Sequence, residues 1–288
     1  MNVLVVGGSG FLGLRITRQA QLAGHRVTAT SHRRVPPPAV GVDWHRLDIR
    51  CRDEVTALAR LARPDAVINA AYQQSDWATT ADGGAHVALA AAAAGSRLVH
   101  VSSDVVFSGA APRYDETSPP DPVTPYGAAK AAAETAVRAI APDAVIARTS
   151  LIIGDGDSKH ERLVHALAAG AADGVLYTDE VRCPVHVADL ALALLELAAA
   201  PHAGTCHVVG PDAVSRHELG LLIAARDGLD PSVLRVGPRP AQPLPRPLDV
   251  RLDGTRTQAR LTTRLRGARL PRARTGLTGR GPRDTVSE

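Results

Sequence analysis

A tyrosine and a lysine stand four residues apart in the segment Tyr126-Gly-Ala-Ala-Lys130. This spacing places both side chains on one face of a helix. Because a neighbouring ammonium favours the phenolate form, we expect Lys130 to lower the pKa of Tyr126 from its ordinary value near ~10. Tyr126 would then exchange a proton with a substrate oxygen near neutral pH. The chain is rich in arginine and keeps only two lysines, Lys130 and Lys159, so a retained lysine indicates a need for lysine chemistry.

A serine pair precedes this helix in the sequence. The segment 97–101 is expected to be the fifth strand, and it ends in Ser102-Ser103-Asp104. A serine hydroxyl can therefore face the same site as Tyr126.

The chain opens with a glycine-rich turn between an expected strand, residues 3–6, and an expected helix, residues 12–23. The spacing is G-x-x-G-x-x-G, which allows a tight turn, close approach to a pyrophosphate, and close packing of the helix on the sheet. N–H groups at the helix start would hold the pyrophosphate. The candidate dinucleotide-binding residues are Gly7, Ser9, Gly10, Phe11, Leu12 and Gly13.

The end of the second expected strand indicates which dinucleotide binds. Enzymes that use NAD usually carry an acidic residue there, but this chain has Ser31 followed by Arg33 and Arg34. The two arginines can pair with a 2′-phosphate through charge-assisted hydrogen bonds. We therefore predict NADP(H) as the cofactor. After the third expected strand, Asp48 and Ile49 are placed to contact the adenine.

Strand and helix patterns alternate through the first half of the chain. This alternation predicts an α/β fold of the Rossmann type, with a doubly wound parallel sheet. After about residue 150 the rhythm changes, and helical patterns occupy 163–169, 189–199 and 216–225. We expect an NADP-binding domain over 1–150, a smaller C-terminal α/β substrate-binding domain over 151–265 packed against it, and a disordered, arginine-rich tail over 266–288.

The composition excludes several classes of protein. Hydrophobic residues make up 45% and charged residues 22%, as in soluble globular proteins. The arginine-rich end lacks aromatic interleaving, so we expect no nucleic-acid partner. The three cysteines have no metal or CxxC spacing, and the N-terminus has neither a basic leader nor a membrane-length apolar run. We expect a cytoplasmic protein with no metal and no membrane contact.

These segments together resemble a known family, the extended short-chain dehydrogenases, and within it the dTDP-4-dehydrorhamnose reductase group. The resemblance covers most of residues 1 to about 265. Its most specific stretch runs over 97–130, with Ser-Ser-Asp-x-Val-Phe, an acidic pair and Pro-x-x-x-Tyr-Gly. The other segments are GGSGFLG, VINAAYQQSD, ARTSLIIG, RCPVHVADLA and RPLDVRLD.

The resemblance implies a role for each candidate. Ser103 would hydrogen-bond the keto oxygen of a nucleotide sugar, Tyr126 would donate the proton, and Lys130 would tune Tyr126 and hold the nicotinamide ribose. Asp104 would lie beside the substrate, and Arg182 would bind its diphosphate. The residues implied to line the cofactor after the fourth strand are Ala70, Ala71 and Tyr72.

The resemblance thus implies an NADPH-dependent reductase of a keto group on a dTDP-activated deoxysugar, working as a homodimer. Two departures near the substrate side leave the sugar open: Leu151 replaces a frequent aromatic residue, and Thr80 a common Asn. One alternative is an epimerase or dehydratase on the same scaffold, which would usually prefer NAD. Another is a non-catalytic, NADP-binding regulatory subunit, against which the joint presence of Ser103, Tyr126 and Lys130 argues.

Overall fold

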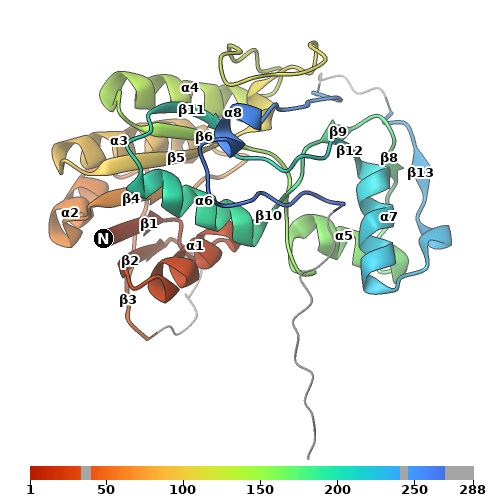
Figure 1. Ribbon diagram of the computed structural model, residues 1–288, viewed down its shortest axis with the longest axis horizontal. Coiled ribbons are helices and arrows are strands. Elements are labelled where there is room, and N and C mark those ends of the chain that lie inside the picture. The colour runs from red at the N-terminus through yellow and green to blue at the C-terminus, as the bar shows by residue number, and fades with distance from the viewer. Residues whose placement is uncertain (34–39, 241–245, 270–288) are drawn as a thin grey trace, which may run out of the picture.

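The computed structural model describes residues 1–33, 40–240 and 246–269. Its centre is a seven-stranded sheet in the order β11-β6-β5-β4-β1-β2-β3, in which every neighbouring pair is parallel (Figure 1). This architecture confirms the predicted Rossmann-type fold. The strands are β1 (Asn2–Val6), β2 (Arg26–Ser31), β3 (Val42–Arg46), β4 (Ala66–Asn69), β5 (Arg97–Ser103), β6 (Val145–Thr149) and β11 (Gly204–His207).

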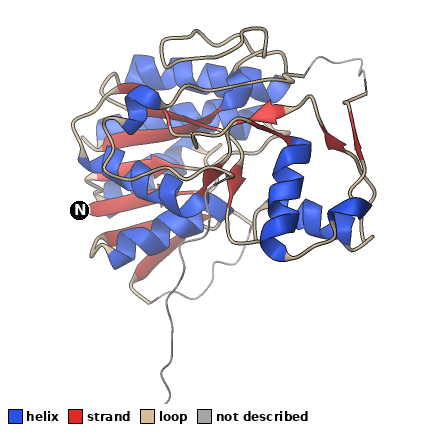
Figure 2. Ribbon diagram, turned by 45° about the vertical axis from the view of Figure 1, so that its right-hand side comes forward, coloured by secondary structure: helices blue, strands red, loops and turns tan. Residues whose placement is uncertain are grey.

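Helices cover both faces of this sheet (Figure 2). One face carries α1 (Phe11–Leu22) and α6 (Val187–Ala199), and the other carries α2 (Arg52–Ala62), α3 (Gly83–Ala93) and α4 (Pro125–Ile140). Because both faces are covered, the central strands are apolar along their whole length rather than alternating.

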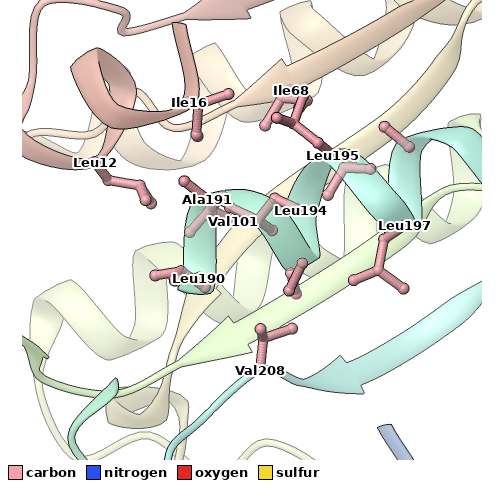
Figure 3. Packing of buried hydrophobic residues seen from close by; sticks show 14 of the residues in the cluster. Leu12, Ile16, Ile68, Val101, Leu190, Ala191, Leu194, Leu195, Leu197 and Val208 are labelled. Carbon is pink, nitrogen blue, oxygen red and sulfur yellow. The ribbon is translucent and has the colours of Figure 1, made fainter. Parts of the chain in front are cut away.

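Strand β1 shows how the two cores divide the side chains. Val3 and Val5 pack with residues of α1 and α6, in the cluster that Figure 3 shows around Leu12, Ile16 and Leu194. Leu4 and Val6 point the other way, into the cluster formed with α2, α3 and α4. Each fully buried aliphatic side chain of this kind stabilises the fold by roughly 1.5–3 kcal/mol.

The strand order also determines where a ligand can bind. After β1 the chain builds outward to β2 and β3, and it then returns to place β4 on the other side of β1. The order reverses at this point, and the crevice at the carboxyl ends of β1 and β4 is the usual ligand site of such sheets.

A second lobe lies to the right of the sheet in Figure 1. It consists of α5 (Lys159–Ala168), α7 (Arg216–Asp227), the 3-10 turn η3 (Pro231–Val233) and the pair β8 (Leu176–Tyr177) and β13 (Val236–Gly237), around its own apolar cluster. Capping boxes at Ser158 and Ser215 begin the two helices. The short elements between the lobes are β7 (Ile152–Ile153), β9 (Val181–Arg182), β10 (Val185–His186), β12 (Val214–Ser215) and α8 (Thr255–Gln258).

The chain crosses between the central sheet and the second lobe more than once. Helix α6 and strand β11 follow residue 150, yet α6 packs on the central sheet and β11 is its edge strand. The boundary at 150 therefore stays a prediction. Arg266, the first residue of the expected tail, pairs with Asp189 of α6 at 2.7 Å, and 270–288 lie outside the described residues. Among the described helices none has the length and apolarity needed to cross a membrane.

Candidate active site

The glycine loop between β1 and α1 has the geometry that a pyrophosphate requires. Gly7 has a φ of +82°, which favours glycine, and a Cβ atom on Gly13 would lie 2.1 Å from the Gly7 carbonyl oxygen. Helix α1 begins after Gly10, and within the described residues no side chain caps it. Its first N–H groups therefore remain available to an anion, and the residues Ser9, Phe11 and Leu12 lie on this turn.

The segment after β4 lies directly against this loop. A Cβ atom on Gly7 would lie 2.8 Å from the backbone nitrogen of Ala71, and the Ala70 nitrogen donates to the Val6 carbonyl at 2.9 Å. The Ala71 nitrogen donates to the Asn69 side chain at 3.1 Å. The structure thus brings the predicted cofactor-lining residues Ala70 and Ala71 to the glycine loop.

The structure brings together only some of the residues that were predicted to contact the adenosine end of the cofactor. Ser31 is buried at the end of β2 and Arg33 is exposed beyond it, whereas Arg34 lies outside the described residues. The Asp48 carboxylate forms a pair of hydrogen bonds with Arg50, at 2.6 and 3.0 Å, and this arginine above all lowers the pKa of Asp48 to about 2. Ile49 is buried among the residues beneath α2 and α3. The adenine roles of Asp48 and Ile49 stay predictions.

The three candidate catalytic residues meet where β5 ends and α4 begins. Thr124 caps α4 by accepting from the Gly127 nitrogen at 3.0 Å, and this places Tyr126 in the first turn. The Tyr126 hydroxyl lies close enough to Ser103 for the serine to lower its pKa, and Lys130 is buried with its Nζ atom donating to the Val101 carbonyl at 3.0 Å.

The electrostatics around Tyr126 and Lys130 correct one expectation. Burial raises the pKa of Tyr126, the neighbouring Tyr72 and Asp104 raise it further, and only Ser103 lowers it. The expected direct lowering by Lys130 was wrong, because burial of the hydroxyl has the largest effect and Lys130 is not among the groups that shift this pKa. Tyr126 is consequently a protonated phenol at neutral pH. That is the form needed in a group that donates a proton.

Burial has the opposite effect on the lysine. It lowers the pKa of Lys130 to about 8, while Glu134 one turn along α4 raises it. The Nζ atom also lies 5.2 Å from the centre of the Tyr72 ring, which packs 5.8 Å from the ring of Tyr126. Tyr72 therefore borders both members of the pair.

Asp104 and Arg182 form an ion pair next to the expected substrate site. Asp104 is buried and accepts from Ser150 at 2.6 Å and from Ser103 at 3.1 Å. The Nε atom of Arg182 lies 3.4 Å from the Asp104 carboxylate. The other guanidinium nitrogens of Arg182 donate to backbone carbonyls, including those of Pro247 and Leu248 at 2.6 Å each. Arg182 is thus beside the substrate side, but its donors are turned into the protein.

Two cations on the side of the second lobe had no role predicted from the sequence. Lys159 begins α5, and its pKa is lowered by burial and by the nearby Arg216 and raised by Asp104. Arg216 begins α7 and donates to Glu180 at 2.8 Å and to His160 at 3.1 Å. The signal for Lys159 was its rarity in this chain, since it is the only lysine besides Lys130. Within the described residues there is no cluster of three or more His, Cys, Asp or Glu side chains that would hold a metal.

The chain matches the model of the RmlD substrate binding domain family over residues 1–271. The dTDP-4-dehydrorhamnose reductase of Mycobacterium tuberculosis is 33% identical over 263 residues, which cover 85% of this chain and 81% of that protein. Methionine adenosyltransferase 2 subunit beta of Bos taurus is 28% identical over 278 residues, covering 89% and 81%.

A solved structure shows the same fold. The dTDP-4-dehydrorhamnose reductase of Bacillus anthracis, crystallised in complex with NADP, superposes with a TM-score of 0.78 at 22% identity, covering 92% of this chain and 95% of that one. The resemblance predicted from the sequence motifs is confirmed by the family match. The chain belongs to the RmlD substrate binding domain family.

Proposed function

We propose that this protein is an NADPH-dependent oxidoreductase that reduces the keto group of a dTDP-activated deoxysugar, as the name of its Mycobacterium tuberculosis relative describes. The observation that carries the proposal is the junction of β5 and α4. There a protonated Tyr126 lies next to Ser103 and to the buried Lys130, at the same edge of the sheet as the uncapped N-terminus of α1.

The residues of this edge fit a dinucleotide. The first N–H groups of α1 would hold the pyrophosphate, Arg33 would pair with the 2′-phosphate, and Lys130 would hydrogen-bond the nicotinamide ribose. Bound NADPH supplies the hydride that reduces the keto carbon. The Bacillus anthracis structure, which was crystallised with NADP, supports this choice of cofactor.

The protein's own contribution to the reaction is the placement of one proton. As the keto carbon is reduced, negative charge develops on its oxygen, and the hydroxyls of Ser103 and Tyr126 are placed to stabilise it by hydrogen bonds. Tyr126 transfers its proton to that oxygen. Since burial keeps the Tyr126 hydroxyl protonated, the proton is present before the substrate arrives.

The contacts favour a change in the residues assigned to the substrate diphosphate. Arg182 was predicted to bind it, but its donors are engaged by Asp104 and by backbone carbonyls. Arg216 is engaged in the same way, by Glu180 and His160, whereas Lys159 at the start of α5 makes no hydrogen bond or ion pair within the described residues and lies near enough to Asp104 for the carboxylate to raise its pKa. We propose that Lys159, with Asp104 and Ser103, faces the nucleotide sugar.

We also propose that the protein works in the cytoplasm. Its cysteines Cys51, Cys183 and Cys206 are all free thiols, which suits a reducing compartment.

The test is a pair of measurements on the purified protein. Nicotinamide fluorescence would be titrated with NADPH and NADH, and absorbance would then follow NADPH oxidation in the presence of dTDP-4-dehydrorhamnose. We expect tighter binding of NADPH and turnover that falls at least about 100-fold in Tyr126→Phe, the size of a general-acid contribution. Tyr177→Phe is a matched control, because that tyrosine lies on β8 of the second lobe, away from the junction of β5 and α4.

Each other outcome points to one alternative. NADPH binding without oxidation would reject the reductase and favour a non-catalytic regulatory subunit; one relative is by name a subunit, methionine adenosyltransferase 2 subunit beta. Isomerisation of a nucleotide sugar without net oxidation of NADPH would favour the epimerase.

A further inference from the structure

Helix α4 presents three residues in one row to strand β5. Tyr126, Lys130 and Glu134 are spaced by four, so they follow one face of the helix. Tyr126 lies next to Ser103, Lys130 donates to the Val101 carbonyl at 3.0 Å, and Glu134 accepts from Ser102 at 2.6 Å. Three consecutive residues of β5 thus meet three consecutive turns of the helix.

Glu134 is the member of this row that the reaction does not use, and it is wholly buried. Arg148 of β6, which is also buried, donates to both of its carboxylate oxygens, at 3.0 and 2.8 Å. Arg138 of the same helix donates to it from the solvent side at 2.9 Å. A carboxylate with this many charge-assisted bonds is fixed in position as well as in charge.

Arg148 extends the connection to the chain that leads into α4. Its NH1 group donates to the Ser118 carbonyl at 3.2 Å, and its guanidinium lies 4.9 Å from the centre of the Phe107 ring. Ser118 belongs to the loop before Tyr126. The pair of Glu134 and Arg148 therefore holds the catalytic helix from its second and third turns and also through the preceding loop.

Glu134 serves as the counter-charge of Lys130, because the other titratable groups that face Lys130 are neutral. Tyr72 and Tyr126 border Lys130 as neutral phenols, since burial raises the pKa of each. His100 of β5 faces it as a neutral ring, because burial lowers its pKa to about 3. Glu134 raises the pKa of Lys130 against the lowering by burial.

The groups around Glu134 itself keep it ionised. Arg148 and Arg138 hold the pKa of Glu134 below its ordinary value although burial opposes them. His207 of β11 also faces this carboxylate, but burial and Arg148 lower the pKa of the ring to about 4, so it is neutral as well.

We propose that Glu134 is a positioning residue for the Tyr126–Lys130 pair: locked by Arg148 and Ser102, its buried carboxylate keeps Lys130 an ammonium and holds α4 in register with β5. This inference rests on the roles that the proposed function gives to Tyr126 and Lys130. It adds a residue that touches neither the substrate nor the cofactor.

The experiment measures how the affinity for NADPH depends on pH, by nicotinamide fluorescence. In the wild type the affinity falls as the pH rises through the pKa of Lys130, which is about 8. In the double variant Glu134→Gln/Arg148→Gln this midpoint moves to lower pH by about one unit, because a buried ammonium loses its counter-charge. The double change removes both members of the buried Glu134–Arg148 pair, and Lys130 can release its proton when its counter-charge is gone, so the variant is expected to fold.

Two further variants complete the design. Glu134→Asp keeps the carboxylate, so the midpoint of this single variant is expected to lie close to that of the wild type. Arg138→Gln removes an exposed cation from the same carboxylate and is expected to leave the midpoint in place, since Arg148 still holds Glu134.

An unchanged midpoint in the double variant, with only a lower melting temperature, would overturn the inference and leave Glu134 a structural residue. The readout does not involve the sugar. Wild-type protein that binds NADPH but reduces no dTDP sugar would overturn the proposed substrate alone, and the midpoint would still decide the role of Glu134.

Discussion

The Nε atom of Arg182 lies 3.4 Å from a carboxylate oxygen of Asp104, and both side chains are almost completely buried. This pair joins β9 to the turn that follows strand β5. Because Arg182 also donates to the carbonyls of Pro247 and Leu248, it connects Asp104 to a segment about 140 residues later in the chain. Arg182 therefore has a structural role first: it links Asp104 to residues 247–248 next to the expected substrate site.

Removal of the Arg182 contacts should lower the free energy of unfolding. Arg182→Met leaves Asp104 as a buried charge without its cation and removes the hydrogen bonds to three backbone carbonyls, so we expect a loss of about 3 kcal/mol or more in the free energy of unfolding. Urea denaturation measures it. Arg251→Met is the control, because that arginine pairs with Asp249 at the surface and should change the stability by less than about 1 kcal/mol. A stable Arg182→Met protein with a raised KM for the sugar would instead restore the diphosphate role.

The difference between prediction and structure at Arg182 has a physical cause. Tyr126 and Lys130 could be paired from sequence because a helix fixes the relation of residues four apart. The glycine loop could be predicted for the same reason, since strand, turn and helix are contiguous. Arg182 is satisfied by carbonyls that lie 65 and 66 residues away, and no local pattern announces such contacts.

Long-range packing also explains the other departures. The raised pKa of Tyr126 follows from the side chains that cover it, and Tyr72, one of these, comes from the loop after another strand. Strand β11 has the pattern of any short buried strand, and its position beside β6 depends on pairing across the sheet. The sequence thus predicted the elements and the chemistry of the site, while the burial that tunes the site required the structure.

The preference for NADPH should depend on Arg33. It is exposed just beyond β2, where a 2′-phosphate would lie, so Arg33→Ser removes a charge-assisted bond of about 1.5–3 kcal/mol. We expect NADPH to bind roughly 10- to 100-fold more weakly and NADH to bind as before. Arg26→Ser is the control, because Arg26 is exposed at the opposite end of the same strand. Equal weakening of both dinucleotides would argue against a contact with the phosphate.

The close packing of α1 on the glycine loop should be intolerant of one added methyl group. A Cβ atom on Gly13 would lie 2.1 Å from the carbonyl oxygen of Gly7, so Gly13→Ala must displace the helix or the loop. We expect a loss of more than about 2 kcal/mol in stability, from overpacking, together with loss of NADPH binding. Gly237→Ala is the control, because its Cβ would make an ordinary 3.6 Å contact with Val175. Calorimetry with and without NADPH separates the two effects, and an unaltered Gly13→Ala protein would contradict this close approach of helix and loop.

The stability of the protein should fall in acid because of a neutral, buried histidine. His100 is almost inaccessible on β5, where the amide nitrogen of Asn69 lies 3.2 Å from its Nδ1 atom, and burial lowers the pKa of the ring to about 3 from 6.5. Below pH 6.5 the unfolded chain takes up a proton at His100, whereas the folded chain stays neutral there until about pH 3. Unfolding therefore binds a proton in this window, and its free energy decreases as the pH falls, by about 1.4 kcal/mol per pH unit for this one group.

The variant His100→Asn should remove this contribution. We expect the slope of the unfolding free energy against pH, measured by urea denaturation between the two pKa values, to decrease by about 1.4 kcal/mol per unit, whatever the stability of the variant at neutral pH. Val99→Ala on the same strand is the matched control, because it removes buried apolar contacts and keeps the histidine. It should lower the stability at every pH and leave the slope as in the wild type. If His100→Asn also kept the wild-type slope, the acid sensitivity would have to arise from other groups, such as the buried ring of His207, whose pKa is lowered to about 4.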